Sequence, residues 1–207
     1  MLRLLFFALI VRPLVLIGLG LNVRRRELLP GRGPAILVAN HASHLDALVL
    51  MSLYPLSSLP KLRPVAAADY FLRNRLVAWL SLNVIGIIPL SRRPKVSEGD
   101  PLAEVGEFLS QGGMAVLFPE GTRSLTGEMG ELKTGVAHLA RRHPAVPVVP
   151  IYVRGLNMAL PKGEALFVPF FCDLFVGESV TWTGDKESFM TELGERLHAL
   201  EDEGRRD

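Results

Sequence analysis

The chain has 207 residues, which is the size of one domain and too short for two full domains. Apolar residues make up 49% and charged residues 21%, so there is enough apolar surface for a core and wholesale disorder is excluded. The single cysteine, Cys172, excludes an internal disulfide and a cysteine-ligated metal centre, and it fits a reducing compartment.

Positive charge is concentrated in the first half of the chain. Residues 1–95 carry 13 lysines and arginines against 3 acidic residues, a net charge of +10, whereas residues 96–207 carry 10 against 18, a net charge of −8. The positive charge of the first half favours an anionic partner: a bilayer surface, a phosphorylated small molecule or a nucleic acid. A nucleic acid is not expected, because aromatic residues are only 7% and neither half contains a recognisable nucleic-acid-binding motif.

The chain begins with an apolar stretch, residues 4–21, that Arg12 and Pro13 interrupt. Its apolar side chains favour insertion into a bilayer by roughly 4 to 8 kcal/mol, while a central arginine costs about 2.5 to 3.5 kcal/mol, so spanning is marginal. A membrane-embedded or interfacial anchor and a helix packed on the protein's own core both fit. The arginines at 24–26 that follow the stretch favour a cytoplasmic location of the domain. We expect residues 1–23 to form a membrane-associating helix and 24–207 the main domain.

The rest of the chain alternates between short apolar runs and longer helical patterns, which is typical of a layered α/β domain. The fold expected is a single such domain with a mixed, mostly parallel central sheet flanked by helices, plus the N-terminal helix. In the tail, apolar residues four, four and three apart indicate a helical face packed on the core. Strands are expected at 35–39, 64–68, 84–90, 114–118 and 146–153, edge strands at 166–171 and 174–176, and helices at 43–54, 70–83, 100–111, 134–143 and 185–203.

A polar cluster that contains His41 and Asp46 directly follows the first predicted strand. In one continuous helix, residues five apart point about 140° away from each other, so these two side chains could not meet. If His41 lies in the loop and Ser43 caps the helix, Asp46 in the first turn can lie beneath the imidazole. A carboxylate there would fix the ring tautomer and stabilise the imidazolium formed when the other ring nitrogen accepts a proton. The pattern therefore predicts a general-base pair.

Other interpretations of this cluster stay open. Ser43 and Asp46 also fit a loose capping box, in which the carboxylate only satisfies a backbone donor. A metal site would use His41, His44 and Asp46, but two further ligand positions of the dinuclear hydrolase pattern are alanines. Nucleophilic catalysis is not indicated, because Ser43 lacks the Gly-x-Ser-x-Gly elbow and Cys172 has no base near it in the sequence.

A second polar cluster, residues 118–124, follows another apolar strand and reads Phe-Pro-Glu-Gly-Thr-Arg-Ser. Gly121 permits a sharp turn, and the planar guanidinium of Arg123 matches a phosphate bidentately. The hydroxyls of Thr122 and Ser124 offer further contacts to an anion.

A third segment, residues 86–93, also ends a predicted strand in arginine, at Arg92 and Arg93. The ends of strands in α/β sheets converge on a shared crevice, so a base and two guanidinium groups are expected to meet there. Taken alone, each arginine also fits a solvated surface position.

Taken together, these segments resemble the glycerolipid acyltransferases, in particular the 1-acylglycerol-3-phosphate acyltransferases. Residues 40–46 resemble the His-x-x-x-x-Asp block of that family, and 86–92, 118–124 and 146–151 resemble its second, third and fourth blocks. One His-x-x-x-x-Asp is common by chance, whereas four blocks in order are highly specific.

The resemblance implies transfer of a fatty acyl group from acyl-CoA or acyl carrier protein to the hydroxyl of 1-acylglycerol 3-phosphate, forming phosphatidic acid without an acyl-enzyme. It implies that His41 is the general base, that Asp46 orients it, and that the acceptor phosphate is held by Arg92 and Arg123 in a pocket shaped by Glu120, Gly121 and Thr122. It implies no cofactor and no metal. The partners would be the thioester donor, a phosphorylated lysolipid and a membrane surface, at the cytoplasmic face.

Other acceptors of the same superfamily remain alternatives at this point: glycerol 3-phosphate, lysophospholipids and amino-acid lipids. A non-catalytic lipid-binding module would keep the fold and lose the chemistry, although an intact His41 and Asp46 argue against it. A metallohydrolase would lose its activity on chelation, whereas the transferase should not.

Overall fold

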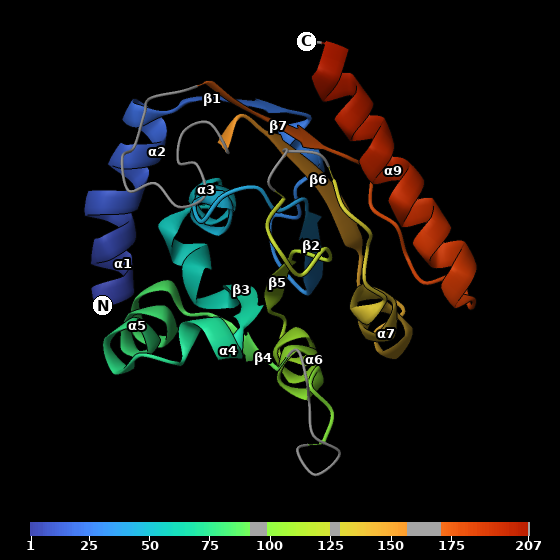
Figure 1. Cartoon of the computed structure of the whole chain (residues 1–207), viewed down its shortest axis with the longest axis horizontal. Coiled ribbons are helices and arrows are strands. Elements are labelled where there is room, and N and C mark those ends of the chain that lie inside the picture. The colour runs from blue at the N-terminus through green and yellow to red at the C-terminus, as the bar shows by residue number, and fades with distance from the viewer. Residues whose placement is uncertain (92–98, 125–128, 157–170, 207) are drawn as a thin grey trace.

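A mixed sheet of seven strands lies at the centre of the described part of the chain (Figure 1). The computed structural model describes residues 1–91, 99–124, 129–156 and 171–206. In the order β1-β7-β6-β2-β5-β3-β4, every neighbouring pair is parallel except β6 and β7, which are antiparallel. The predicted α/β domain with a mostly parallel sheet is thereby confirmed. The strands are β1 (Gly20–Arg24), β2 (Ala35–Ala39), β3 (Leu62–Ala67), β4 (Ile88–Leu90), β5 (Met114–Leu117), β6 (Val148–Arg154) and β7 (Phe171–Val176).

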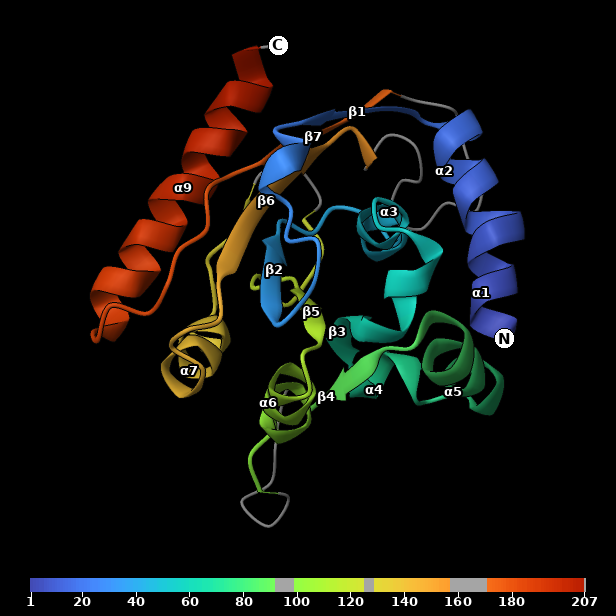
Figure 2. The same cartoon turned by 180° about the vertical axis from the view of Figure 1, so that it is seen from behind.

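Helices cover both faces of this sheet (Figures 1 and 2). The N-terminal helix and α3 (Asp46–Ser52) pack on one face, and α6 (Ala103–Ser110), α7 (Gly135–Arg142) and α9 (Lys186–Arg206) pack on the other. The apolar stripe predicted in the tail is buried along α9, as expected of core packing. Shorter helical segments are η2 (Arg26–Leu28), η3 (Leu56–Lys61), α4 (Ala68–Phe71), α5 (Arg75–Leu80) and the π-helical η4 (Ser81–Ile85).

The central strand β2 shows why this layered arrangement forms. All five of its residues are buried, as expected of a parallel strand that is covered on both faces. Because side chains alternate along a strand, Leu37 packs with the N-terminal helix and α3, while Ile36 and Val38 pack with α6, α7 and α9. The strand pairs with β5 on one side and β6 on the other, which places its carboxyl end in the middle of one sheet edge.

The N-terminal helix is one continuous helix made of α1 (Leu2–Phe6), the π-helical η1 (Phe7–Val11) and α2 (Arg12–Gly18). The π-helical segment ends two residues before Pro13, and such a wider turn lets a helix pass a residue that has no backbone N–H. Arg12, which interrupts the apolar stretch, donates a hydrogen bond to the carbonyl oxygen of Tyr54 at 2.6 Å. An arginine inside an apolar helix is therefore satisfied by the protein itself.

The two faces of this helix differ in their surroundings. Phe7, Val11 and Val15 are buried in the core, so packing on the protein's own core describes the inner face. On the outer face Leu9 and Ile17 are exposed, the latter by 84%. None of the described helices is both long and apolar enough to span a bilayer.

Strand β1 was not predicted, because the helix was expected to continue to residue 23. The helix ends at Gly18, and Gly20–Arg24 pair in parallel with β7. A side chain at position 20 would meet the ring of Phe171, so glycine permits this close approach. The sheet thus begins before residue 24. The residues after β1 tie this strand to the rest of the domain, because Arg25 binds Glu203 of α9 at 2.7 Å and Arg26 donates a hydrogen bond to the carbonyl oxygen of Leu53.

The predicted helix over 70–83 and the predicted strand over 84–90 were partly wrong. α4 ends at Phe71, and the side chain of Asn74 begins α5 because it accepts hydrogen bonds from the amides of Leu76 and Val77. The helix then continues through η4 up to Gly86, whose φ of 76° terminates it, which leaves only Ile88–Leu90 for the strand. The edge strand expected at 166–171 lies outside the described residues except for Phe171, where β7 begins.

Candidate active site

The structure brings His41 and Asp46 together at the carboxyl end of β2. His41 lies in the loop, and Asp46 is the first residue of α3, so the two side chains are not on one helix. His41 Nδ1 and Asp46 Oδ2 are 2.8 Å apart, the carboxylate is fully buried and the imidazole is 24% exposed. Since Nδ1 faces the carboxylate, Nε2 is the ring atom that can take a proton from a substrate.

Asp46 also organises the loop that carries His41. Its Oδ2 accepts hydrogen bonds from the backbone amides of Ala42 at 2.8 Å and Ser43 at 2.9 Å. Asp46 therefore makes both predicted interactions, the hydrogen bonds to backbone amides and the contact with the imidazole. One consequence is that His41 is held by both its ring and its own loop.

Two neighbours of this pair, which sequence reasoning did not single out, restrict it further. Buried Asn40 donates to the carbonyl oxygen of Val153 and accepts from its amide, at 2.9 and 2.7 Å, which ties the end of β2 to β6. The ring of Phe118 stacks on the imidazole of His41 with centroids 4.4 Å apart. Asn40 precedes His41 in the sequence, and Phe118 opens the second polar cluster. Their positions next to predicted site residues were the sequence signal that could have identified them.

Glu120 joins the loop after β5 to the loop after β2. Its Oε1 accepts a hydrogen bond from the amide of His41 at 2.8 Å, and its Oε2 accepts one from the amide of Gly130 at 3.0 Å. The amide of Ser124 in turn donates to the carbonyl oxygen of His41 at 2.8 Å. Because β2 and β5 are adjacent and parallel, both loops leave the sheet at the same edge. Burial raises the pKa of Glu120 above its ordinary value of 4.5, against the effect of the two amides.

Gly121 forms the turn of the second loop and packs against Lys133. Its φ of 69° lies in the left-handed region, and a Cβ there would come within 2.5 Å of Lys133 Nζ. The left-handed conformation is what favours glycine here, because the end of the flexible Lys133 side chain could move aside. Lys133 was not predicted as a site residue, and no spacing signal in the sequence connects it with Gly121.

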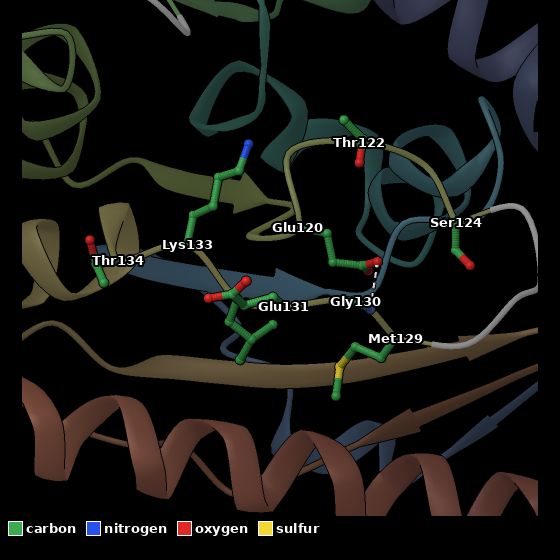
Figure 3. Close-up of a pocket in the computed structure, with 9 residues that line it drawn as sticks. Glu120, Thr122, Ser124, Met129, Gly130, Glu131, Lys133 and Thr134 are labelled. Carbon is green, nitrogen blue, oxygen red and sulfur yellow. Dashed lines mark hydrogen bonds between the residues drawn. The ribbon is translucent and has the colours of Figure 1, made fainter.

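Beside this turn lies a pocket of about 750 Å³ (Figure 3). Glu120, Thr122 and Ser124 reach it from the loop after β5, while Lys133 and Thr134 reach it from the segment that leads into α7. The pocket thus combines hydroxyl groups and an ammonium group with two carboxylates, those of buried Glu120 and exposed Glu131. A phosphorylated ligand could accept hydrogen bonds from the hydroxyl groups and the ammonium group.

Arg123 lies on the side of this loop that faces the first cluster. It is half-buried, and its positive charge acts on His44. Burial first, and then the charges of Arg123 and His41, lower the pKa of His44 below 6.5. Arg123 thus contributes positive charge close to the loop that carries His41 and His44. Arg92, the other predicted phosphate ligand, lies outside the described residues, beyond the end of β4.

Neither a metal centre nor a thiol nucleophile is supported in the described ranges. No group of three or more histidine, cysteine, aspartate or glutamate side chains among the residues that the structure describes is arranged to hold a metal ion. Cys172 is fully buried in β7, and burial raises the pKa of its thiol far above the usual value. A thiol held in this state is a poor nucleophile.

The Acyltransferase family model matches residues 20–154, which include both loops of the site. This chain belongs to the acyltransferase family. The acyltransferase match spans β1 through β6, so it covers the sheet edge at which His41, Asp46 and Arg123 lie.

Named relatives of this acyltransferase are 1-acyl-sn-glycerol-3-phosphate acyltransferases. A chloroplastic one from Arabidopsis thaliana is 33% identical over 145 residues, 70% of this chain and 38% of the relative. The alpha form from Bos taurus is 30% identical over 185 residues, 88% of this chain and 61% of the relative. The chain thus spans less than two thirds of the length of these relatives. A crystal structure of the 1-acyl-sn-glycerophosphate acyltransferase from Thermotoga maritima shares the fold, with a TM-score of 0.75 and 23% identity over 97% of this chain and 77% of that one.

Proposed function

We propose that the protein is a 1-acylglycerol-3-phosphate O-acyltransferase, which uses acyl-CoA or acyl carrier protein to form phosphatidic acid. The single observation that carries this proposal is the 2.8 Å contact between His41 Nδ1 and Asp46 Oδ2, in a loop joined to one that carries Arg123. The names of the relatives support the choice of acceptor.

In the proposed reaction, His41 Nε2 takes the proton of the acceptor hydroxyl as its oxygen attacks the thioester carbonyl. The Asp46 carboxylate stabilises the imidazolium that results. The tetrahedral intermediate then collapses, the carbon–sulfur bond breaks, and the thiolate takes the proton back from the imidazolium. The products are the new ester and a free thiol, and no acyl-enzyme, cofactor or metal takes part.

Arg123 would hold the acceptor phosphate, with Thr122 as an additional donor and Arg92 as a second guanidinium. A guanidinium binds a phosphate bidentately, which positions the acceptor as well as attracting it. Lys133 lines the pocket beside the Gly121 turn together with Thr122, whereas Arg123 is not among the residues that line it. Gly121 and Glu120 would act on this pocket indirectly, by fixing the turn and the loop.

We also propose that the enzyme associates with a membrane at its cytoplasmic face through residues 1–23. The exposed apolar side chains on the outer face of the N-terminal helix support an interfacial position. The net charge of +10 in the first half supports contact with anionic headgroups, because basic residues near such a surface contribute about 1 kcal/mol each.

The direct test is to incubate purified protein with labelled acyl-CoA or acyl carrier protein and a panel of acceptors, and to identify the products by mass spectrometry. The panel contains 1-acylglycerol 3-phosphate, glycerol 3-phosphate, a lysophospholipid and an amino-acid lipid. We expect phosphatidic acid from the first acceptor, without an effect of a chelator. A product from one of the other acceptors alone would reassign the substrate, and the absence of any product would contradict the proposal.

A further inference from the structure

A second segment of the chain exposes apolar side chains in a way that the core does not explain. The helical turns from α4 through α5 and η4 leave Leu76 67% and Trp79 49% exposed, together with Leu72, Leu80 and Leu82. A helix that is apolar around most of its circumference is normally buried. This one lies at the surface, so its environment in the working protein should be apolar on that side.

This segment lies beside the N-terminal helix. η4 packs against α1, and the guanidinium of Arg3 lies against Gly86 at the end of η4. In both views α1 and α5 are neighbours at one edge of the molecule, whereas α9 lies at the opposite edge (Figures 1 and 2). The two exposed apolar segments therefore belong to one side of the protein.

The charges around the segment favour an anionic bilayer over a second copy of the chain. Arg73 and Arg75 are exposed beside the apolar side chains. Of the three acidic residues in 1–95, Asp46 is buried in the site, and Asp69 is exposed on α4, where it offsets only part of the charge of these arginines. Pairing of this side with itself would bring arginines together, whereas anionic headgroups would neutralise them. Trp79 and Tyr70 are of the residue types enriched where a bilayer meets water.

The segment also reaches the catalytic loop. The rings of Tyr70 in α4 and His44 stack with centroids 6.0 Å apart, and the guanidinium of Arg73 lies 5.4 Å from the centre of the Tyr70 ring. His44 lies three residues after His41, in the loop between β2 and α3. A lipid that leaves the bilayer along α4 would therefore meet the catalytic loop first.

We propose that α4, α5 and η4 form a second membrane-contacting element, which docks on an anionic bilayer next to the outer face of the N-terminal helix. This inference rests on the proposed function, since it explains how the catalytic loop meets a lipid acceptor. Its test reads the position of Trp79, and that position does not depend on turnover.

Trp79 is a built-in probe, because the chain has only two tryptophans. The variant Trp182→Phe keeps Trp79 alone, and Trp79→Phe keeps Trp182, which packs against Phe189 of α9 at the other edge. Each is mixed with vesicles of phosphatidylcholine and phosphatidylglycerol whose acyl chains carry bromine. We expect at least about twofold quenching of Trp79 and little quenching of Trp182. Binding without quenching of Trp79 would overturn the proposal, because the N-terminal helix would then dock alone.

A matched pair of charge reversals tests the headgroup contact. Arg75→Glu and Arg141→Glu change the net charge equally, but Arg141 is exposed on α7, away from this side. We expect Arg75→Glu to weaken binding to anionic vesicles about tenfold and Arg141→Glu to change it little. Equal effects of the two variants would contradict a specific contact at α5.

The double variant Leu76→Ser/Leu80→Ser separates the remaining outcomes. We expect it to fold normally by circular dichroism, to bind vesicles weakly and to retain turnover of a water-soluble short-chain acceptor. If it instead converts a dimer to a monomer and binds vesicles normally, a second copy covers this side and the proposal fails. Quenching of Trp79 in Trp182→Phe, together with no turnover of any acceptor by the wild-type protein, would refute the proposed function and leave the membrane contact standing.

Discussion

Asp46 uses one carboxylate oxygen for three donors: the ring of His41 and the amides of Ala42 and Ser43. A buried carboxylate with several donors has a fixed position, because each hydrogen bond restricts it from a different direction. The imidazole that it holds is restricted as well, and the stacked Phe118 ring limits the remaining rotation. If His41 is the base, as proposed, an imidazole held in this way needs little reorganisation before it accepts a proton.

At the same scale, Arg123 should determine how tightly the acceptor binds. Arg123→Ala is expected to raise the KM for 1-acylglycerol 3-phosphate about tenfold to a hundredfold, because a charge-assisted, bidentate contact is lost. The KM for the thioester should change much less. Steady-state kinetics with each substrate varied in turn measure both, and Arg141→Ala serves as the control. A rise confined to the thioester would assign Arg123 to the donor instead.

Between elements, the important connection is the one from the loop after β5 to the loop after β2. Glu120 accepts from His41 with one oxygen and from Gly130 with the other, so it needs two acceptor atoms. A glutamine at this position would turn an N–H group toward one of the two amides. The shape of the side chain would be kept, but one hydrogen bond would be replaced by a repulsive contact of two donors.

Glu120→Gln is therefore expected to lower kcat about tenfold to a hundredfold with a small change in KM, because His41 is misplaced rather than removed. It should also cost about 1 to 3 kcal/mol of stability at neutral pH, through the unpaired amide. A merely structural role would lower stability without the selective loss of kcat. Unchanged kcat in a folded variant would refute the positioning role.

The pH dependence of the free energy of unfolding tests the environment of Glu120. Because the folded protein raises the pKa of Glu120 above 4.5, it binds a proton more tightly than the unfolded chain does. The stability that this contributes is present below pH 4.5 and is lost as the pH rises through the folded-state pKa. The stability advantage of the wild type over Glu120→Gln should thus shrink as the pH rises through this window, as measured by chemical denaturation.

The strands that carry the site could be predicted, and several elements around them could not. β2 and β5 are continuous apolar runs that end in polar clusters, a pattern that identifies both the strand and the loop after it. β1 gave no such signal, because Gly20–Arg24 becomes a strand only by pairing with β7, which lies about 150 residues further along the chain. The cap at Asn74 is a local signal that was missed, since asparagine before an apolar helix favours a helix start.

At the scale of the whole molecule, the roles of the N-terminal arginines became clear only from the tertiary structure. Arg12 interrupts the apolar stretch, but it donates a hydrogen bond to the carbonyl oxygen of Tyr54 and thereby ties the helix to the domain. Arg25 and Arg26 were interpreted as flanking charges, and both contact the protein. The role of Lys133 beside Gly121 also depends on tertiary contact, which no local pattern encodes.

The proposed function depends most on His41 as the base that activates the acceptor hydroxyl. The decisive measurement is kcat for phosphatidic acid formation by His41→Ala, compared with His138→Ala, which changes an exposed histidine on α7. We predict that kcat falls about a thousandfold in His41→Ala, within the range for loss of a general base, while the unfolding midpoint changes little and His138→Ala stays at the wild-type rate. Turnover of His41→Ala near the wild-type rate would contradict the account.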